Sequence, residues 1–197
     1  MKKKSLALVL ALAMIVVCVV GGTLAWLTDK TAPVTNTFTY GDINIELKET
    51  GATVAADGSA TKEFKMIPGY TIDKDPKVTV LAGSEKCYLF VKVDKSTNFD
   101  TFMTYDMAAG WTQGDGTNIP SNVYYRVVDA STADQEFGVL ANDKVTVKDT
   151  VTKADMDGLK ANVATQPTLT FTAYAVQLNE NNTTEFTPAQ AWAKVYP

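Results

Sequence analysis

Hydrophobic and polar residues alternate along much of this chain, and that period of two is typical of β-strands with one buried face. The segment Ile43–Lys48 places an apolar side chain at every second position. The segment Thr168–Leu178 has one face made of Leu169, Phe171, Ala173 and Ala175. The two small alanines on that face indicate that another sheet approaches closely. By contrast, Cys87–Val93 is apolar almost throughout, which predicts a central strand buried on both faces.

Further strands are predicted where β-branched and aromatic residues cluster between turn residues. These segments are Val78–Leu81, Val123–Asp129, Phe137–Leu140 and Val145–Lys148. Asp57-Gly58 is a strong turn signal because both residue types tolerate positive φ. It predicts a hairpin between a strand near Ala52–Ala56 and a strand that ends at Met66.

A first helix is predicted at Lys153–Asn162. Met156, Leu159 and Val163 recur there at helical spacing, and Thr152 is placed to cap the first turn. The carboxylates of Asp155 and Asp157 are then expected to lie near the start of this helix.

A second helix is predicted at Pro188–Val195. Thr187 and Gln190 have the spacing of a capping box, and proline suits the first helical turn. Trp192 and Val195 share one face, which we expect to close one end of a sandwich.

The strands and helices together predict an all-β protein, an antiparallel β-sandwich with one or two short helices. Of the 197 residues, the first 25 have the features of a signal peptide, and the remaining 172 suit one domain. We therefore expect residues 1–25 to be a signal peptide and residues 26–197 to form a single domain.

The N-terminal segment carries the export signal. Three lysines precede an apolar run from Leu6 to Val20, and Thr23 and Ala25 are small residues at the −3 and −1 positions of a cleavage site. We expect cleavage between Ala25 and Trp26 by a signal peptidase. The alternative is a retained anchor, since the uncharged stretch of roughly 20 residues is long enough to cross a bilayer. Contact with a membrane is expected only through this uncleaved segment.

The charge balance restricts the classes of partner that the protein can bind. Removing the three signal lysines from 18 basic residues leaves 15 against 22 acidic ones, a formal charge of −7. Arg126 is the single arginine. Nucleic acids and anionic membranes require clustered positive charge, so we expect neither as a partner. Cys18 leaves with the signal, and Cys87 in its apolar strand is predicted to be a buried, unreactive thiol.

The chain contains no histidine, which excludes imidazole zinc sites and histidine-dependent nucleophilic catalysis. We expect no enzyme activity, no catalytic residues, no metal ligands and no cofactor. Asp73 and Asp75 are predicted to lie in a loop before Pro76, and Asp155 and Asp157 in the first helix. Neither pair has the spacing of a calcium loop, and both are interpreted as solvated carboxylates. Carboxylates alone could still hold calcium better than zinc, and this alternative stays open.

Four aromatic residues are candidates for a sugar-binding face, namely Tyr105, Trp111, Tyr124 and Tyr125. Aromatic residues of a sandwich more often pack in its core. The structural interpretation is therefore preferred at this stage.

Several segments of the chain resemble a known family. They are Gly21–Asp29, Asn36–Leu47, Ile67–Gly69, Asp75–Val80, Lys86–Val93, Thr172–Gln177 and Ala189–Ala193. The chain resembles the TasA/camelysin family of secreted Gram-positive surface and biofilm-matrix proteins. The resemblance implies a jelly-roll sandwich and processing by a SipW-type signal peptidase. It also implies a location in the extracellular matrix or on the cell surface. The camelysin branch is labelled as metallopeptidases, which the missing histidine disfavours here.

Three function classes follow: a fibre-forming matrix subunit, a camelysin-like surface peptidase, and a monomeric adhesin or glycan-binding module. We expect the first, a secreted structural protein that associates with itself into fibres. Its predicted donor strand consists of Trp26, Leu27, Thr28, Asp29, Lys30, Thr31 and Ala32. Pro33 separates this segment from the first strand, and two large apolar residues stand at its new terminus. The alternative is a solvated tail.

Overall fold

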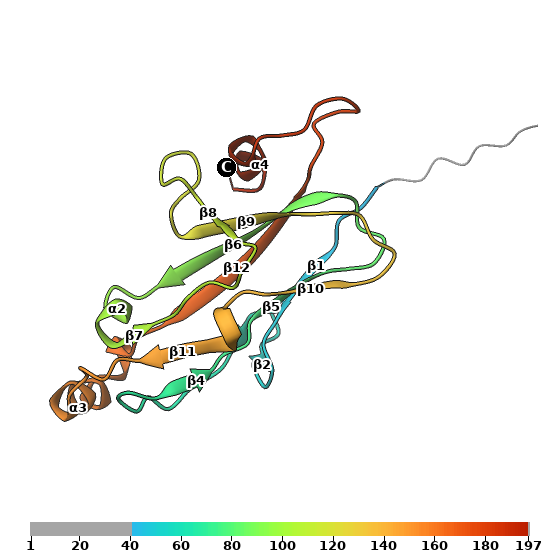
Figure 1. The fold of residues 1–197 in the computed structure, drawn as a ribbon. Coiled ribbons are helices and arrows are strands. Elements are labelled where there is room, and N and C mark those ends of the chain that lie inside the picture. The colour runs from blue at the N-terminus through green and yellow to red at the C-terminus, as the bar shows by residue number, and fades with distance from the viewer. Residues whose placement is uncertain (1–40, 197) are drawn as a thin grey trace, which may run out of the picture. The chain divides into compact units, whose positions relative to one another are not determined.

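The computed structural model describes residues 41–196, all of which belong to one compact unit (Figure 1). The predicted signal peptide, the Ala25/Trp26 cleavage site and the donor segment Trp26–Ala32 lie outside the described residues. Most of the regular structure is antiparallel β-sheet with few helices, which confirms the coarse prediction. Within residues 41–196, no helix is long and apolar enough to cross a membrane.

The strands are β1 (Ile45–Lys48), β2 (Thr53–Val54), β3 (Ala60–Thr61), β4 (Thr71–Asp73), β5 (Lys77–Val80), β6 (Cys87–Lys95), β7 (Met103–Thr104), β8 (Thr112–Gln113), β9 (Val123–Val128), β10 (Gln135–Gly138), β11 (Lys144–Val147) and β12 (Leu169–Gln177). The helices are α2 (Phe99–Phe102), α3 (Lys153–Ala161) and α4 (Pro188–Val195), with 3₁₀ turns at Ala141–Asp143 and Val163–Thr165.

Four antiparallel sheets form among the described strands. The largest has the order β12-β6-β9-β8, and two three-stranded sheets have the orders β1-β5-β10 and β4-β11-β7. The fourth is the β2-β3 hairpin. Strand β6 lies inside the largest sheet and pairs over its whole length with β12. Its position agrees with its nearly continuous apolar sequence, because a strand flanked on both sides and covered on both faces has little contact with water.

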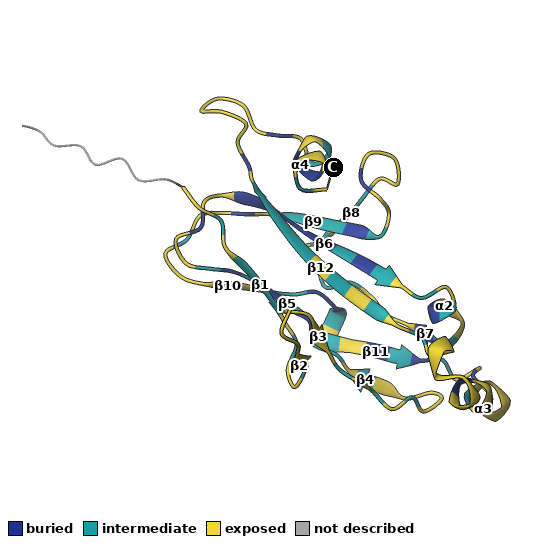
Figure 2. Cartoon of the chain, turned by 180° about the vertical axis from the view of Figure 1, so that it is seen from behind, coloured by how far each residue is buried: buried dark blue, intermediate teal, exposed yellow. Residues whose placement is uncertain are grey.

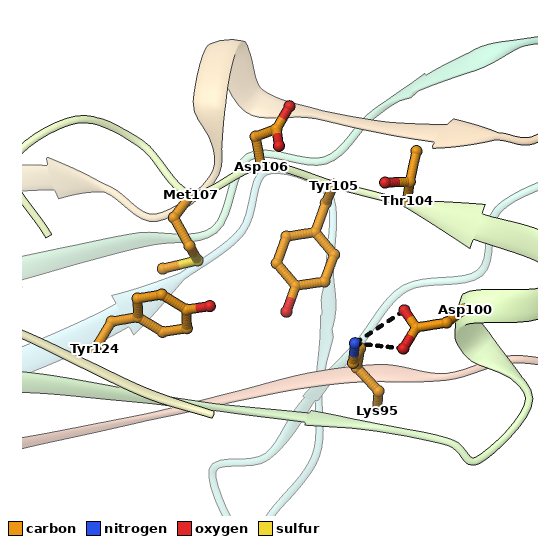
Figure 3. Close-up of a pocket in the computed structure, with 7 residues that line it drawn as sticks. All are labelled: Lys95, Asp100, Thr104, Tyr105, Asp106, Met107 and Tyr124. Carbon is orange, nitrogen blue, oxygen red and sulfur yellow. Dashed lines mark hydrogen bonds and ion pairs between the residues drawn. The ribbon is translucent and has the colours of Figure 1, made fainter. Parts of the chain in front are cut away.

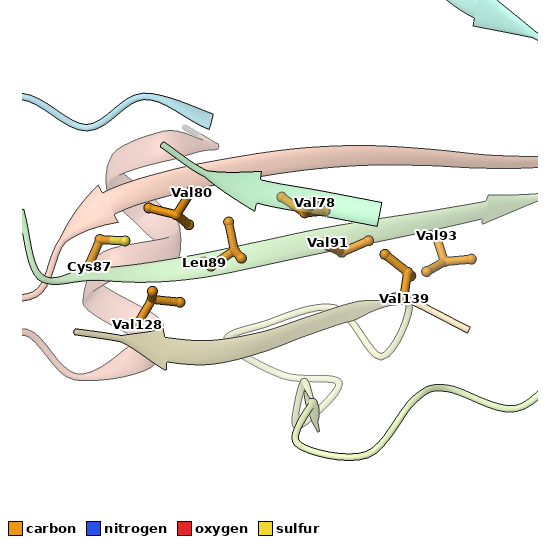
Figure 4. Packing of buried hydrophobic residues seen from close by; sticks show 8 residues of the cluster. All are labelled: Val78, Val80, Cys87, Leu89, Val91, Val93, Val128 and Val139. Carbon is orange, nitrogen blue, oxygen red and sulfur yellow. The ribbon is translucent and has the colours of Figure 1, made fainter. Parts of the chain in front are cut away.

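The main core lies between the β12-β6-β9-β8 sheet and the β1-β5-β10 sheet (Figure 4). Val78 and Val80 of β5 pack there with Leu89 and Val91 of β6, and all four are at most 1% exposed. Burying a side chain of this size contributes about 1.5–3 kcal/mol. The predicted apolar face of β12 packs on the same core, so the interpretation of its alanines is confirmed.

Helix α4 lies on the outer face of the largest sheet and forms a further layer. The Trp192 ring is 5.3 Å from Phe90 and 5.4 Å from Tyr174, centroid to centroid. Phe90 belongs to a second cluster of buried residues, on the face opposite to Leu89, and the half-buried Tyr174 packs against that cluster. The prediction that α4 closes one end of the sandwich is therefore wrong. The outward aromatic residues of β6 and β12 form an apolar face in the middle of the sheet, and the helix covers it.

Three local predictions differ from the structure. The hairpin has its turn at the expected place, but only Gly58 takes positive φ (84°), and β3 ends at Thr61 rather than near Met66. Asp73 is the last residue of β4 instead of a loop residue. Helix α3 ends at Ala161, so Val163 is not on its apolar face and is 68% exposed.

The third sheet, β4-β11-β7, has its own cluster of buried residues. Val145 and Val147 of β11 pack there with Phe99, Met103 and Leu140. Phe171 of β12 also contacts this cluster, which connects it to the main core. The start of the segment between β6 and β9 is therefore held in place by its buried residues Phe99 and Met103.

Candidate functional site

The longest free sheet edge among the described strands is that of β12. The Leu178 N–H donates to the Lys86 carbonyl (2.9 Å), and the Ser96 N–H donates to the Thr168 carbonyl (3.0 Å). Even-numbered residues of β12 therefore form the hydrogen-bonded pairs with β6. It follows that the odd-numbered residues direct their peptide N–H and C=O groups away from β6, along the edge. They are Leu169, Phe171, Ala173, Ala175 and Gln177.

The neighbouring edge on this side of the molecule is β1. It pairs with β5 on one side only among the described strands, and it lies close to β12 of the facing sheet. Its side chains and those of β12 contact the same core, but they are only half-buried (Figure 2). These half-buried core residues are Ile43, Ile45, Leu47, Leu169, Phe171, Ala173 and Ala175. We call them the β1/β12 edge surface.

The opposite side of the sandwich is closed by the segment between β7 and β9. The Ala108 N–H donates to the Val139 carbonyl (2.9 Å), and the Trp111 indole N–H donates to the Gly138 carbonyl (2.9 Å). The Arg126 guanidinium lies 4.1 Å from the Phe137 ring centroid and 5.4 Å from that of Trp111. Burial lowers the pKa of Arg126. These contacts hold the two sheets together there, so the two sides of the sandwich differ.

A surface depression of about 330 Å³ lies beside this closure (Figure 3). It is lined by Lys95, Asp100, Thr104, Tyr105, Asp106, Met107 and Tyr124. The Lys95 ammonium donates to both carboxylate oxygens of Asp100 (2.8 and 2.7 Å). It also lies 5.8 Å from the Tyr105 ring centroid. Burial raises the pKa of Tyr105 to about 12, so its phenol stays protonated in neutral solution.

The four aromatic candidates separate in the structure. Tyr105 and Tyr124 come together in the depression. Trp111 is hydrogen-bonded to Gly138 of β10, which belongs to the β1-β5-β10 sheet. Tyr125 packs against the aromatic residues under α4, on the outer face of the largest sheet. A single sugar-binding face made of all four is therefore excluded.

Sequence reasoning missed Lys95 and Asp100. Their pairing depends on α2, a single helical turn after β6 that has no sequence signal strong enough to predict it. The five-residue spacing of one lysine and one aspartate is too common to single them out.

The carboxylates predicted to be solvated all have hydrogen-bond or ion-pair partners. Asp75 accepts from the Thr50 N–H (3.2 Å) and hydroxyl (2.6 Å), and Asp73 pairs with Lys144. In α3, Asp155 completes a capping box with Thr152, and its pKa is lowered mainly by the Thr152 side-chain hydrogen bond. Within residues 41–196, no three acidic or cysteine side chains gather as a metal site.

The remaining sequence candidate, Cys87, is fully buried at the start of β6. Burial raises the pKa of its thiol to about 11. The prediction of a buried thiol is confirmed.

Comparison of the chain with protein-family models, with curated protein sequences and with solved structures gives no significant match.

Proposed function

We propose that this protein is a secreted structural protein of the extracellular matrix or cell surface, and that it assembles into fibres by strand donation. In this proposal it is a TasA/camelysin-like protein released by a SipW-type signal peptidase after Ala25. Its fold is then a jelly-roll type of sandwich. Support for that topology is the distance in sequence between strands that pair, such as β6 and β12, since long crossovers are typical of such folds.

The observation that carries the proposal is the β1/β12 edge surface. Strands in the middle of a sandwich bury their core side chains fully, as β5 and β6 do, whereas β1 and β12 leave theirs half-buried. Unpaired edges also tend to accept a strand from another chain. An added strand on this side would pair with the outward peptide groups of β12 and shield the half-buried side chains from water.

The donor proposed for this edge surface is Trp26–Ala32 of a neighbouring subunit. Burying a leucine-sized side chain such as Leu27 contributes about 1.5–3 kcal/mol. Pairing of a terminal segment with the body of the next subunit is a head-to-tail contact, which produces open filaments when its rotation does not close. Cleavage before Trp26 would free the donor only after export.

The test is electron microscopy and sedimentation of the exported protein over a concentration series. We expect polymers whose amount rises with concentration. In a Trp26→Ala/Leu27→Ala variant, the concentration needed for assembly should rise about tenfold or more, because the anchors lose their burial. The matched control is Thr28→Ala/Thr31→Ala, which alters the same segment without removing large apolar groups.

Two results would contradict the proposal. A protein that stays monomeric at every concentration is not a fibre subunit. Fibres that form equally well in the Trp26→Ala/Leu27→Ala variant and in the control variant would retain the fibre function but remove the donor role of this segment.

A further inference from the structure

We propose that the depression lined by Tyr105, Tyr124 and Lys95 binds a neutral sugar ring. This site is separate from the β1/β12 edge surface, and it would operate in a monomer as well as in a fibre. The inference therefore does not depend on the proposed assembly.

Three polar side chains of the depression lie near one another. In Figure 3 the hydroxyl of Tyr124 points toward Tyr105, and the Lys95 ammonium lies beside the Tyr105 ring. These residues come from β9, from the segment after β7, and from the end of β6, so three distant parts of the chain supply them. A volume of about 330 Å³ is at the lower end of the range of small-ligand pockets.

The Lys95 ammonium is fixed before any ligand arrives. Both oxygens of Asp100 accept from it, and the rings of Phe99 and Tyr105 lie 6.0 and 5.8 Å away. A fixed donor loses less conformational entropy on binding than a free lysine would. An exposed ion pair contributes little to stability, so the position of this pair beside the Tyr105 phenol is more informative than its energy.

The charges select the class of ligand. Asp100 balances Lys95, and Asp106 adds a negative charge at the rim, so an anionic ligand would meet repulsion. A purely apolar ligand would remove water from the ammonium and phenols without replacing their hydrogen bonds, which is costly. A neutral ligand with many hydroxyl groups can accept from Lys95 and donate to Asp100. The phenols can do both, because a tyrosine hydroxyl is a donor as well as an acceptor.

Apolar surface for the ring carbons is also present. Met107 and the two tyrosine rings line the same depression. Sugar rings combine hydroxyl groups at the rim with C–H groups on their faces, so they match this mixture of phenols, ion pair and thioether better than a flexible polyol does.

The test is NMR titration of the full chain in detergent whose headgroup contains no sugar. The probes are methyl glucoside, methyl mannoside and N-acetylglucosamine, with galacturonate as the acidic comparison. We expect at least one neutral sugar to shift the amide signals of Thr104, Tyr105 and Tyr124, and galacturonate to bind more weakly.

Tyr105→Phe and Tyr124→Phe each remove one hydroxyl and keep the ring. Each should weaken binding about two- to tenfold, the range for a lost hydrogen bond. Tyr70→Phe is the matched control, because Tyr70 is 62% exposed and lies outside the depression. The amide spectrum of each variant reports whether it is folded.

Two outcomes would overturn the inference. One is the absence of amide shifts around the depression with every neutral sugar at its highest soluble concentration. The other is binding that Tyr105→Phe and Tyr124→Phe, both folded, change no more than Tyr70→Phe does.

Discussion

Cys87 illustrates how burial controls the chemistry of a single residue. Its side chain lies in the main core with Val80 and Leu89, and no charged partner accompanies it there. Burial disfavours the thiolate, which is the form that reacts. The thiol is therefore a small apolar core group.

This burial predicts resistance to thiol reagents. Relative to the ordinary value of 9.0, a pKa of about 11 lowers the thiolate fraction at pH 8 roughly a hundredfold. After treatment with iodoacetamide at pH 8, the Cys87 peptide should be unmodified in the folded protein and fully modified in urea. Mass spectrometry of the digested protein distinguishes the two. Rapid modification without denaturant would show that the start of β6 opens readily.

The same group makes the free energy of unfolding depend on pH. The folded pKa lies above the unfolded one, so between about pH 9 and 11 the unfolded chain loses this proton while the folded protein keeps it. The Cys87 contribution is fully present below pH 9 and is lost as the pH rises through this window.

Single residues of the depression could be predicted only in part from the sequence. Tyr105 and Tyr124 attract attention as aromatic residues in a polar stretch, but their meeting depends on the path of the chain between β7 and β9. The stacking of Arg126 on Phe137 was not predicted at all. Phe137 and Trp111 lie 11 or more residues away from Arg126 in the sequence. No local sequence pattern identifies the residues that a single arginine side chain will contact.

At the scale of secondary-structure elements, α4 is a short helix whose bounds are well predicted by its local sequence. Thr187 accepts from the Gln190 N–H, Gln190 accepts in return from the Thr187 N–H, and Pro188 occupies the first turn. The predicted bounds, Pro188–Val195, are those of the structure. The helix is held against the sheet by Trp192, which is 4% exposed.

The capping box of α4 predicts a measurable contribution to the free energy of unfolding. Thr187→Ala should lower the free energy of unfolding by about 0.5–2 kcal/mol, because the first turn loses a side-chain acceptor. Urea denaturation followed by circular dichroism measures this change. Thr152→Ala removes the equivalent cap of α3, whose apolar face has Leu159 as its buried residue, and it serves as the comparison. An unchanged midpoint for Thr187→Ala would mean that α4 is held by its sheet contacts alone.

Long periodic strands were predictable, and very short ones were not. The alternation of β12 and the continuous apolar run of β6 identify them because burial acts on many residues at once. Strands β4, β7 and β8 have only two or three residues each, and they form where a neighbouring strand happens to pass. Their pairing is decided by tertiary packing, which local sequence does not contain.

At the scale of the whole molecule, the two sides of the sandwich are unequal. One side is joined across the sheets by Trp111, Arg126 and the bond from Ala108 to Val139. On the other side, the edges β1 and β12 have no strand partner beyond β5 and β6 among residues 41–196. The sequence predicts a donor segment, and the structure adds the β1/β12 edge surface that we propose as its acceptor.

Hydrogen exchange can test this acceptor residue by residue. In β12 the amides of Thr170, Thr172 and Tyr174 point toward β6, whereas those of Phe171, Ala173 and other odd-numbered residues point outward. On assembly, we expect the outward amides to gain protection and the inward amides to change little, because only the outward groups acquire partners.

The comparison is made on one preparation, below and above the concentration at which polymers form, with exchange quenched and peptides resolved by mass spectrometry and fragmentation. Leu89 and Val91 of β6, already paired on both sides, are the internal control. Fibres in which the odd-numbered amides of β12 exchange as fast as in the monomer would show that the donor does not pair with this edge.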